Sequence, residues 1–202
     1  MEKVKTFKDI FTFNLLKLND EGRFISFRRN EDAYTDVTES ILNKPIISIG
    51  LKSQYLYLEG DGFKASPIKQ QFTKDEKEMY KAKAGKNRRY RMIYLPTVKV
   101  TYIMTYGNGI GESFYMAGVG ISDAFKITNI ERRSTVHRKS NKIGVKFYAP
   151  VIEKLNIRDI SLDEKDRATI QELRTYFEPY KPATKPATET TAEVATTDEV
   201  PF

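Results

Sequence analysis

Tyrosine and basic side chains recur together through the middle of the chain. Nine of the twelve tyrosines lie between Tyr55 and Tyr148, and lysines and arginines are interleaved with them. Aromatic rings can stack on unpaired nucleobases, while cations can hold the phosphates of the same strand. The residues that could take part in this chemistry are Tyr55, Tyr57, Arg88, Arg89, Tyr90, Arg91, Tyr94, Lys99, Tyr115, Arg132, Arg133, Arg138, Lys139, Lys142, Lys146 and Tyr148.

A structural interpretation of the same residues stays open. A tyrosine in a strand often packs in the core, as alternation predicts for Tyr102 and Tyr106, and a run of charge is often only a solvated surface. Tyr55, Tyr57 and Tyr148 are the tyrosines most expected to be exposed, because each stands opposite the apolar positions of its strand.

The residue types leave little room for enzyme chemistry. The chain has no cysteine and a single histidine, His137, which excludes disulfides and thiolate sites and argues against a metal cage or a Ser-His-Asp triad. The segments 75–77 and 163–165 have the Asp-x-Lys spacing of some nucleases, but both stand at predicted helix starts, where acids complement the helix dipole. We therefore expect no catalytic activity, no cofactor and no metal, and we interpret His137 as a phosphate contact.

The charge is divided unevenly along the chain. The net charge is +7, yet residues 186–202 contain four acids and no base. Leaving out those four negative charges raises the total by four, so residues 1–185 carry +11. A cationic body with an anionic tail indicates an anionic partner for the body.

The last five residues form the most specific motif in the sequence. The tip consists of two acids, an aliphatic residue, a proline and a phenylalanine: Asp198, Glu199, Val200, Pro201 and Phe202. With the low-complexity segment before it, the tip resembles the acidic C-terminal tip of bacterial and phage single-stranded DNA-binding proteins. The resemblance implies that the Phe202 ring and carboxylate dock on partner enzymes while Asp198 and Glu199 meet basic residues; it does not extend to the body.

Period-two alternation predicts several strands. Residues 97–106 alternate most clearly, and 23–28, 124–130 and 143–148 also read as strands. Within 45–59 the apolar positions change from odd to even, which requires a bulge or bend near Gly50 or Ser53. Gly107-Asn108-Gly109 predicts a tight turn into 112–119 and hence a β-hairpin, while 30–38 and the basic segment 131–142 are expected to be loops.

Capping boxes predict two helices, one opening at Thr73 and ending near Ala84 and one opening at Ser161 and ending before Pro179. Residues 6–18 are expected to form a short helix, although part of the segment also alternates like a strand. After Tyr180 the composition of Pro, Ala, Thr and Glu predicts disorder.

The predicted fold class is mainly β (α+β): an OB-type β-barrel with short flanking helices in residues 1–180, followed by a disordered tail and docking tip in 181–202. The barrel follows from the resemblance of the tip and from the habit of that fold. No apolar run approaches the length of a membrane span, and no signal peptide is evident, so a location in the cytoplasm of a bacterium or phage-infected host is expected.

These features together predict a sequence-independent single-stranded DNA-binding protein, a monomer or small homo-oligomer that acts in DNA replication, recombination and repair. Its partners would be single-stranded DNA and, through the tip, a polymerase, helicase, primase or nuclease. Two alternatives stay open: a recombination enzyme or nuclease subunit carrying a similar tail, and an architectural protein that binds RNA or duplex DNA.

Overall fold

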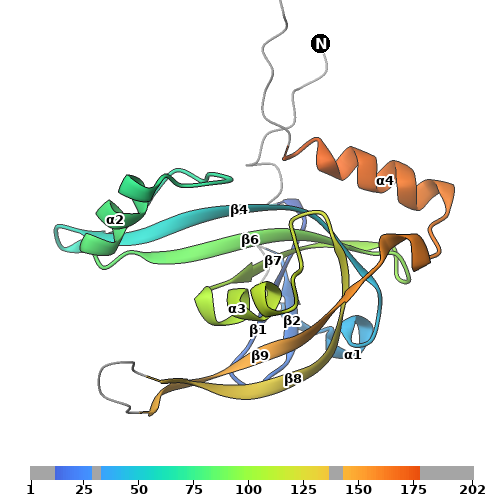
Figure 1. Ribbon diagram of the computed structural model, residues 1–202, viewed down its shortest axis with the longest axis horizontal. Helices are drawn as coiled ribbons and strands as arrows, with labels where there is room; N and C mark the ends of the chain where they lie inside the picture. The colour runs from blue at the N-terminus through green and yellow to red at the C-terminus, as the bar shows by residue number, and fades with distance from the viewer. Residues whose placement is uncertain (1–11, 29–32, 137–142, 178–202) are drawn as a thin grey trace, which may run out of the picture.

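The computed structural model of the protein describes residues 12–28, 33–136 and 143–177. The expected contacts His137, Arg138, Lys139 and Lys142 lie outside these residues, as do residues 6–11 of the expected N-terminal helix and the tail with its tip. Figure 1 shows a strongly curved sheet, with the helix α3 (Asn108–Met116) inside the bend and the helix α4 (Glu164–Arg174) on the opposite side.

The described chain is mainly β, as predicted, with four α-helices. The strands are β1 (Asn14–Leu18), β2 (Phe24–Phe27), β3 (Thr35–Asp36), β4 (Ile46–Glu59), β5 (Gly62–Ala65), β6 (Lys86–Leu95), β7 (Val100–Tyr106), β8 (Ala124–Val136) and β9 (Ile143–Leu155). The other helices are α1 (Thr38–Ile41), α2 (Lys74–Ala82) and the 3-10 turn η2 (Ile157–Asp159).

All nine described strands belong to one sheet in the order β3-β2-β1-β7-β6-β4-β8-β9, with β5 added to β4. The β1–β7 pair is parallel, and the other pairs of described strands are antiparallel. The prediction of an OB-type barrel is wrong in this respect: the described strands form an open sheet, since no pairing joins the edge strands β3 and β9.

The two ends of the sheet approach each other through side chains. Strand β8 pairs with β4 at two positions and then turns away with β9, which bends the sheet strongly. The ring of Tyr148 on β9 packs against Gly22 in the β1–β2 turn, where a Cβ would lie 2.8 Å from the ring atom Cδ1. The β9 strand therefore meets the β1–β2 turn through a side chain and not through backbone pairing.

The predicted bend in β4 is confirmed. The pairing of β4 with β6 shifts register between Ser48 and Gly50, which changes the parity of the apolar positions. The ring of Phe177, just after α4, packs on Gly50, where a Cβ would lie 2.3 Å from the ring atom Cγ. Glycine at position 50 therefore permits the close approach of the C-terminal turn.

The strand predictions for 23–28, 124–130 and 143–148 are confirmed by β2, β8 and β9. The strand predicted over 97–106 is confirmed for 100–106, which form β7, whereas residues 97–99 belong to the turn before it. The capping box predicted at Thr73 is also present, with reciprocal bonds to Glu76. The box of α4 starts two residues later than predicted, because Asp163 rather than Ser161 is the N-cap and Asp166 is its partner.

Three segments differ from their predictions. Residues 108–116 form α3 instead of continuing a hairpin, because Ile110, Phe114 and Ala117 recur at helical spacing and pack into the core. Residues 14–18 form β1 instead of a helix, paired with β2 and β7. The segments 35–36 and 131–136, expected in loops, belong to β3 and β8.

The sheet has two apolar faces with separate cores. The enclosed face, inside the bend, holds Leu16, Phe24, Met104 and Phe125 against Phe114 of α3. The outer face holds a second core beneath α4, which consists of Leu15, Ile47, Ile49, Tyr90, Met92, Tyr94 and Ile103 with Ile170 and Leu173 of the helix. Both faces of the central strands are therefore buried.

Candidate nucleic-acid interface

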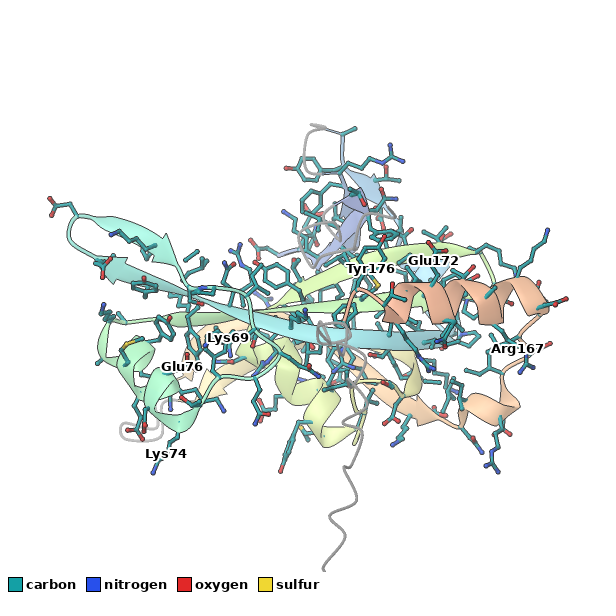
Figure 2. The ribbon with its side chains drawn as sticks, turned by 90° about the horizontal axis from the view of Figure 1, so that it is seen from above. Lys69, Lys74, Glu76, Arg167, Glu172 and Tyr176 are labelled. Carbon is teal, nitrogen blue, oxygen red and sulfur yellow. The ribbon has the colours of Figure 1, made fainter. Side chains whose placement is uncertain are left out.

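The strands β4, β5 and β6 continue beyond α4 and carry an exposed part of the outer face. Figure 2 looks down on the molecule and shows α4 at one end of β4 and α2 at the other. Along β6, Tyr90 and Met92 lie in the core beneath α4, so alternation places the even-numbered residues before them on the same face. We call the outer-face residues of this region the open face: Lys52, Gln54, Leu56, Leu58, Phe63, Lys86 and Arg88.

Two apolar side chains of the open face are exposed to water. The exposed fraction of Phe63 is 74%, and that of Leu58 is 43%. The two residues are cross-strand partners in the β4–β5 hairpin, so their side chains are neighbours on one surface. An aromatic ring this exposed contributes little to the core and is available for stacking.

The open face also carries cations without acidic partners. Lys86 and Arg88 are exposed, and their side chains make no hydrogen bond or ion pair in the described part of the chain. At the same end of the sheet, Glu59 is bonded by Lys64 (2.6 Å) and Lys83 (3.0 Å), and these hydrogen bonds lower the pKa of the Glu59 carboxyl. Glu59 is thus paired with other lysines and not with Lys86 or Arg88, which leaves these two cations for an external anion.

Lys52 lies at the edge of the open face, next to the turn that follows α4. Its Nζ is 5.7 Å from the centre of the Phe177 ring, and partial burial lowers the pKa of its ammonium group. A partly desolvated cation interacts more strongly with an approaching anion than a fully hydrated one does. The described part of the chain ends at residue 177, next to this lysine.

Four residues expected at the interface are buried, namely Tyr55, Tyr90, Arg91 and Tyr94, so the expectation that they are exposed is wrong. The ring of Tyr55 stacks on Tyr80 of α2 with centroids 4.9 Å apart. Alternation placed Tyr55 opposite the even-numbered residues, as observed, but α2 covers that face.

Arg91 belongs to the enclosed core. Its guanidinium lies 4.2 Å from the centre of the Phe114 ring, and it donates hydrogen bonds to the Gly120 carbonyl (2.7 Å) and to the Ser48 and Tyr106 hydroxyls. These partners satisfy a buried cation, so Arg91 orders the sheet and does not face solvent.

Tyr94 and Lys99 fasten α4 to the sheet. The Tyr94 hydroxyl donates to Asp166 at 2.6 Å, and burial together with this bond raises the pKa of Tyr94 to about 12. Lys99 Nζ donates to both oxygens of Asp166 at 2.7 Å and to Asp163 at 2.9 Å, which raises the pKa of Lys99. Lys99 thus acts as a structural cation, contrary to the expected contact with DNA.

The same network determines the charge state of Asp166. Burial alone raises the pKa of the Asp166 carboxyl, but hydrogen bonds from Lys99, Tyr94 and the backbone N–H of Asp163 outweigh it and hold that pKa at about 2. Asp166 is therefore a buried carboxylate whose acceptor sites are used inside the protein.

The other expected residues are spread over several surfaces. Arg88 is on the open face, whereas Tyr57 is half-buried with Lys83 Nζ 5.2 Å from its ring centre. Tyr115, on α3, is 86% exposed. The remaining expected residues are Arg89, next to α3, and Arg132, Arg133, Lys146 and Tyr148 on the β8–β9 ribbon.

Cations of the ribbon are partly engaged by neighbours. Arg133 donates to the Ser113 hydroxyl at 3.2 Å and pairs with Glu131 at 3.5 Å. Arg132 and Lys146 are exposed. The structure therefore does not bring the expected residues into one cluster. The open face contains no tyrosine, and Arg88 is its only residue that was predicted from the sequence to bind DNA.

The open face could have been found from one local signal. Gly60-Asp61-Gly62 is a turn sequence that folds β4 back on β5 and places Phe63 opposite Leu58. Phe63, which is flanked by Gly62 and Lys64, is then expected at the exposed end of a hairpin.

Within residues 12–28, 33–136 and 143–177, no three His, Asp or Glu side chains gather as a metal site would require. None of the described helices has the length and apolar character of a membrane span. Comparisons with models of protein families, with curated proteins and with solved structures found no match.

Proposed function

We propose that the protein binds single-stranded DNA on the open face without preference for base sequence. The observation that carries the proposal is the exposed ring of Phe63 on the same sheet surface as Lys86 and Arg88, two cations without a described acidic partner. Stacking needs a free ring and phosphates need free cations, and this surface offers both.

The chemistry of the open face favours a single strand over a duplex. An unpaired base can lie flat on Phe63, and such stacking contributes about 1–3 kcal/mol per base by alanine substitution. Lys86 supplies a point charge for a phosphate, while the planar guanidinium of Arg88 can bind two phosphate oxygens together. Neither contact distinguishes one base from another, so binding is independent of sequence.

The proposal extends to the segment 181–202, which carries four acids followed by the tip Val200-Pro201-Phe202. We propose that residues 198–202 dock on replication or recombination enzymes, so that DNA coated by the protein attracts them. An apolar residue pair and a phenylalanine next to acids suit a pocket with basic residues at its rim. Deleting residues 198–202 removes such docking and leaves the open face intact.

The test is a titration of fluorescently labelled oligo(dT) followed by anisotropy. Replacing Phe63 by alanine is expected to weaken binding about tenfold, in line with the ~1–3 kcal/mol of one stacked base. The matched control is Tyr115→Ala, because Tyr115 is 86% exposed but lies on α3, which packs on the enclosed face. Equal losses in the two variants, or no loss in Phe63→Ala, would refute the location.

Unlabelled competitors test the class of ligand. Single-stranded DNA is expected to displace the probe at lower concentration than a duplex of the same length, because paired bases cannot reach Phe63. Stronger competition by duplex DNA or by RNA would favour an architectural role instead. Metal-dependent cleavage of the probe would favour the nuclease alternative.

A further inference from the structure

A second aromatic and cationic cluster lies on β1 and β2, outside the open face. Tyr34, just before β3, is 63% exposed, and its ring centre is 5.5 Å from that of Phe27. Lys17 Nζ lies 5.4 Å from the Phe27 ring centre and 5.3 Å from the Tyr34 ring centre. One ammonium group thus touches two rings, one of which is open to solvent.

This cluster belongs to the same side of the sheet as the open face. Phe27 is the cross-strand partner of Leu15, and both pack in the core beneath α4. Lys17 is two residues from Leu15 and therefore projects to the same face. Because α4 packs on this face as well, the cluster and the open face belong to the same face of the sheet.

The charge around the cluster favours an anion. No described carboxylate pairs with Lys17, and the acid that the register places on this face, Asp36, is bonded by Arg23 at 3.1 Å and by the backbone N–H of Thr38 at 3.0 Å. The hydrogen bonds from Thr38, together with the weaker contribution of Arg23, lower the pKa of the Asp36 carboxyl and compensate its charge. The positive charge of Lys17 is therefore available to an anion from outside the protein.

We propose that Lys17, Phe27 and Tyr34 form a second nucleotide subsite, in which a base stacks on Tyr34 and its phosphate meets Lys17. The inference rests on the proposed binding of single-stranded DNA and deepens it by adding a second contact point on one strand. Phe27 supports the Tyr34 ring from behind, so the exposed side of Tyr34 is held ready for a base.

The spacing of the two sites sets the length of DNA that can join them. From β5 to β2 the sheet order passes through β4, β6, β7 and β1, five steps of about 4.8 Å, so the sites are about 24 Å apart across the strands in addition to their offset along the strands. Four nucleotides at the ~3.4 Å spacing of a duplex strand span about 10 Å, whereas twenty span about 65 Å. The longer strand can therefore reach from Phe63 to Tyr34.

The absence of tryptophan from the chain allows a direct test. A Tyr34→Trp variant is titrated with oligo(dT) of about twenty nucleotides, with tryptophan emission and the anisotropy of labelled DNA recorded together. Emission is expected to be quenched in step with binding, since a base stacks on the indole. Tyr115→Trp, at the still more exposed ring on α3 (86% against 63%), is the control and is expected to show no quenching.

A second measurement separates binding from a structural role. Tyr34→Ala is expected to weaken binding of the long oligo(dT) about tenfold, while Tyr34→Phe keeps wild-type affinity because the ring remains. DNA binding with unchanged Tyr34→Trp emission, or with unchanged affinity in Tyr34→Ala, overturns the subsite and leaves the proposed function in place. Absence of binding by the wild-type protein overturns both.

Discussion

The bond between Asp166 and its partners gives a prediction whose magnitude follows from the structure. Asp166 is buried at the start of α4, where Tyr94 and Lys99 donate to its carboxylate. These bonds hold the pKa of the carboxyl at about 2 in the folded protein, against a usual value of 3.8. Replacing Asp166 by asparagine keeps the shape of the side chain and removes its charge.

The expected loss in stability follows from linkage between protonation and folding. A folded pKa below the unfolded value stabilises the protein at pH above the unfolded pKa, and this stabilisation is lost as pH falls through the folded pKa. The difference between 3.8 and about 2 corresponds to about 2 kcal/mol at pH 7 and about 1 kcal/mol at pH 3. Asp166→Asn is therefore expected to be about 2 kcal/mol less stable than the wild type at pH 7.

Urea unfolding at pH 7 and pH 3 checks this value. With a slope of about 2 kcal/mol per molar urea, the midpoint of Asp166→Asn is expected about 1 M lower at pH 7. The control is Glu164→Gln, which changes an exposed acid in the same helical turn. Its free energy of unfolding is expected to fall by less than about 1 kcal/mol, because only the interaction of Glu164 with the helix dipole is lost. A wild-type midpoint for Asp166→Asn at pH 7, or a deficit that does not shrink at pH 3, would refute the reasoning.

Two further predictions concern the C-terminal part of the chain. Gly50→Ala is expected to destabilise the protein by about 1–3 kcal/mol because its Cβ meets the Phe177 ring, and Phe177→Ala in that background should recover part of the loss, as measured by urea unfolding. Deleting residues 181–202 is expected to tighten oligo(dT) binding at low salt, because four acids then no longer compete near Lys52; unchanged or weaker binding in an anisotropy titration would contradict this.

Local signals in the sequence predicted much of the sheet. The alternation in 100–106 corresponds to β7, and the parity change in β4 corresponds to the register shift next to Gly50. The capping box at Thr73 opens α2 as predicted. These features depend on neighbouring residues along the chain, so they can be read without knowledge of the rest of the fold.

Predictions that depend on long-range packing were less accurate. Gly107-Asn108-Gly109 has the local preference of a tight turn, but Phe114 gains more by packing against Tyr106 and Phe125 from a helix. Tyr55 was correctly placed opposite the even-numbered residues, yet alternation identifies residues that share a face and not which face a distant helix covers. The burial of Tyr55 by α2 and of Arg91 by α3 therefore required the structure.

The candidate site shows the same division between local and long-range information. The sequence predicted cations and rings on strands, and the structure selects the few that share an exposed surface. Arg88 belongs to the candidate site both in the sequence prediction and in the structure. Phe63 and Tyr34 have exposed rings, whereas the expected Tyr55 and Tyr90 are buried. In a sheet with both faces covered, buried and exposed aromatic residues follow the same alternating pattern. The sequence pattern therefore could not distinguish the buried rings from the exposed ones.

The salt dependence of oligo(dT) binding tests the central proposal most directly. The double variant Lys86→Ala/Arg88→Ala is compared with Arg158→Ala/Lys165→Ala, which removes the same charge from exposed positions near the start of α4. If each open-face cation neutralises one phosphate, the slope of log K against log[salt] becomes less steep by about 1.4 in the first variant and stays at the wild-type value in the second. Equal slopes in both variants would show that DNA does not contact the open face.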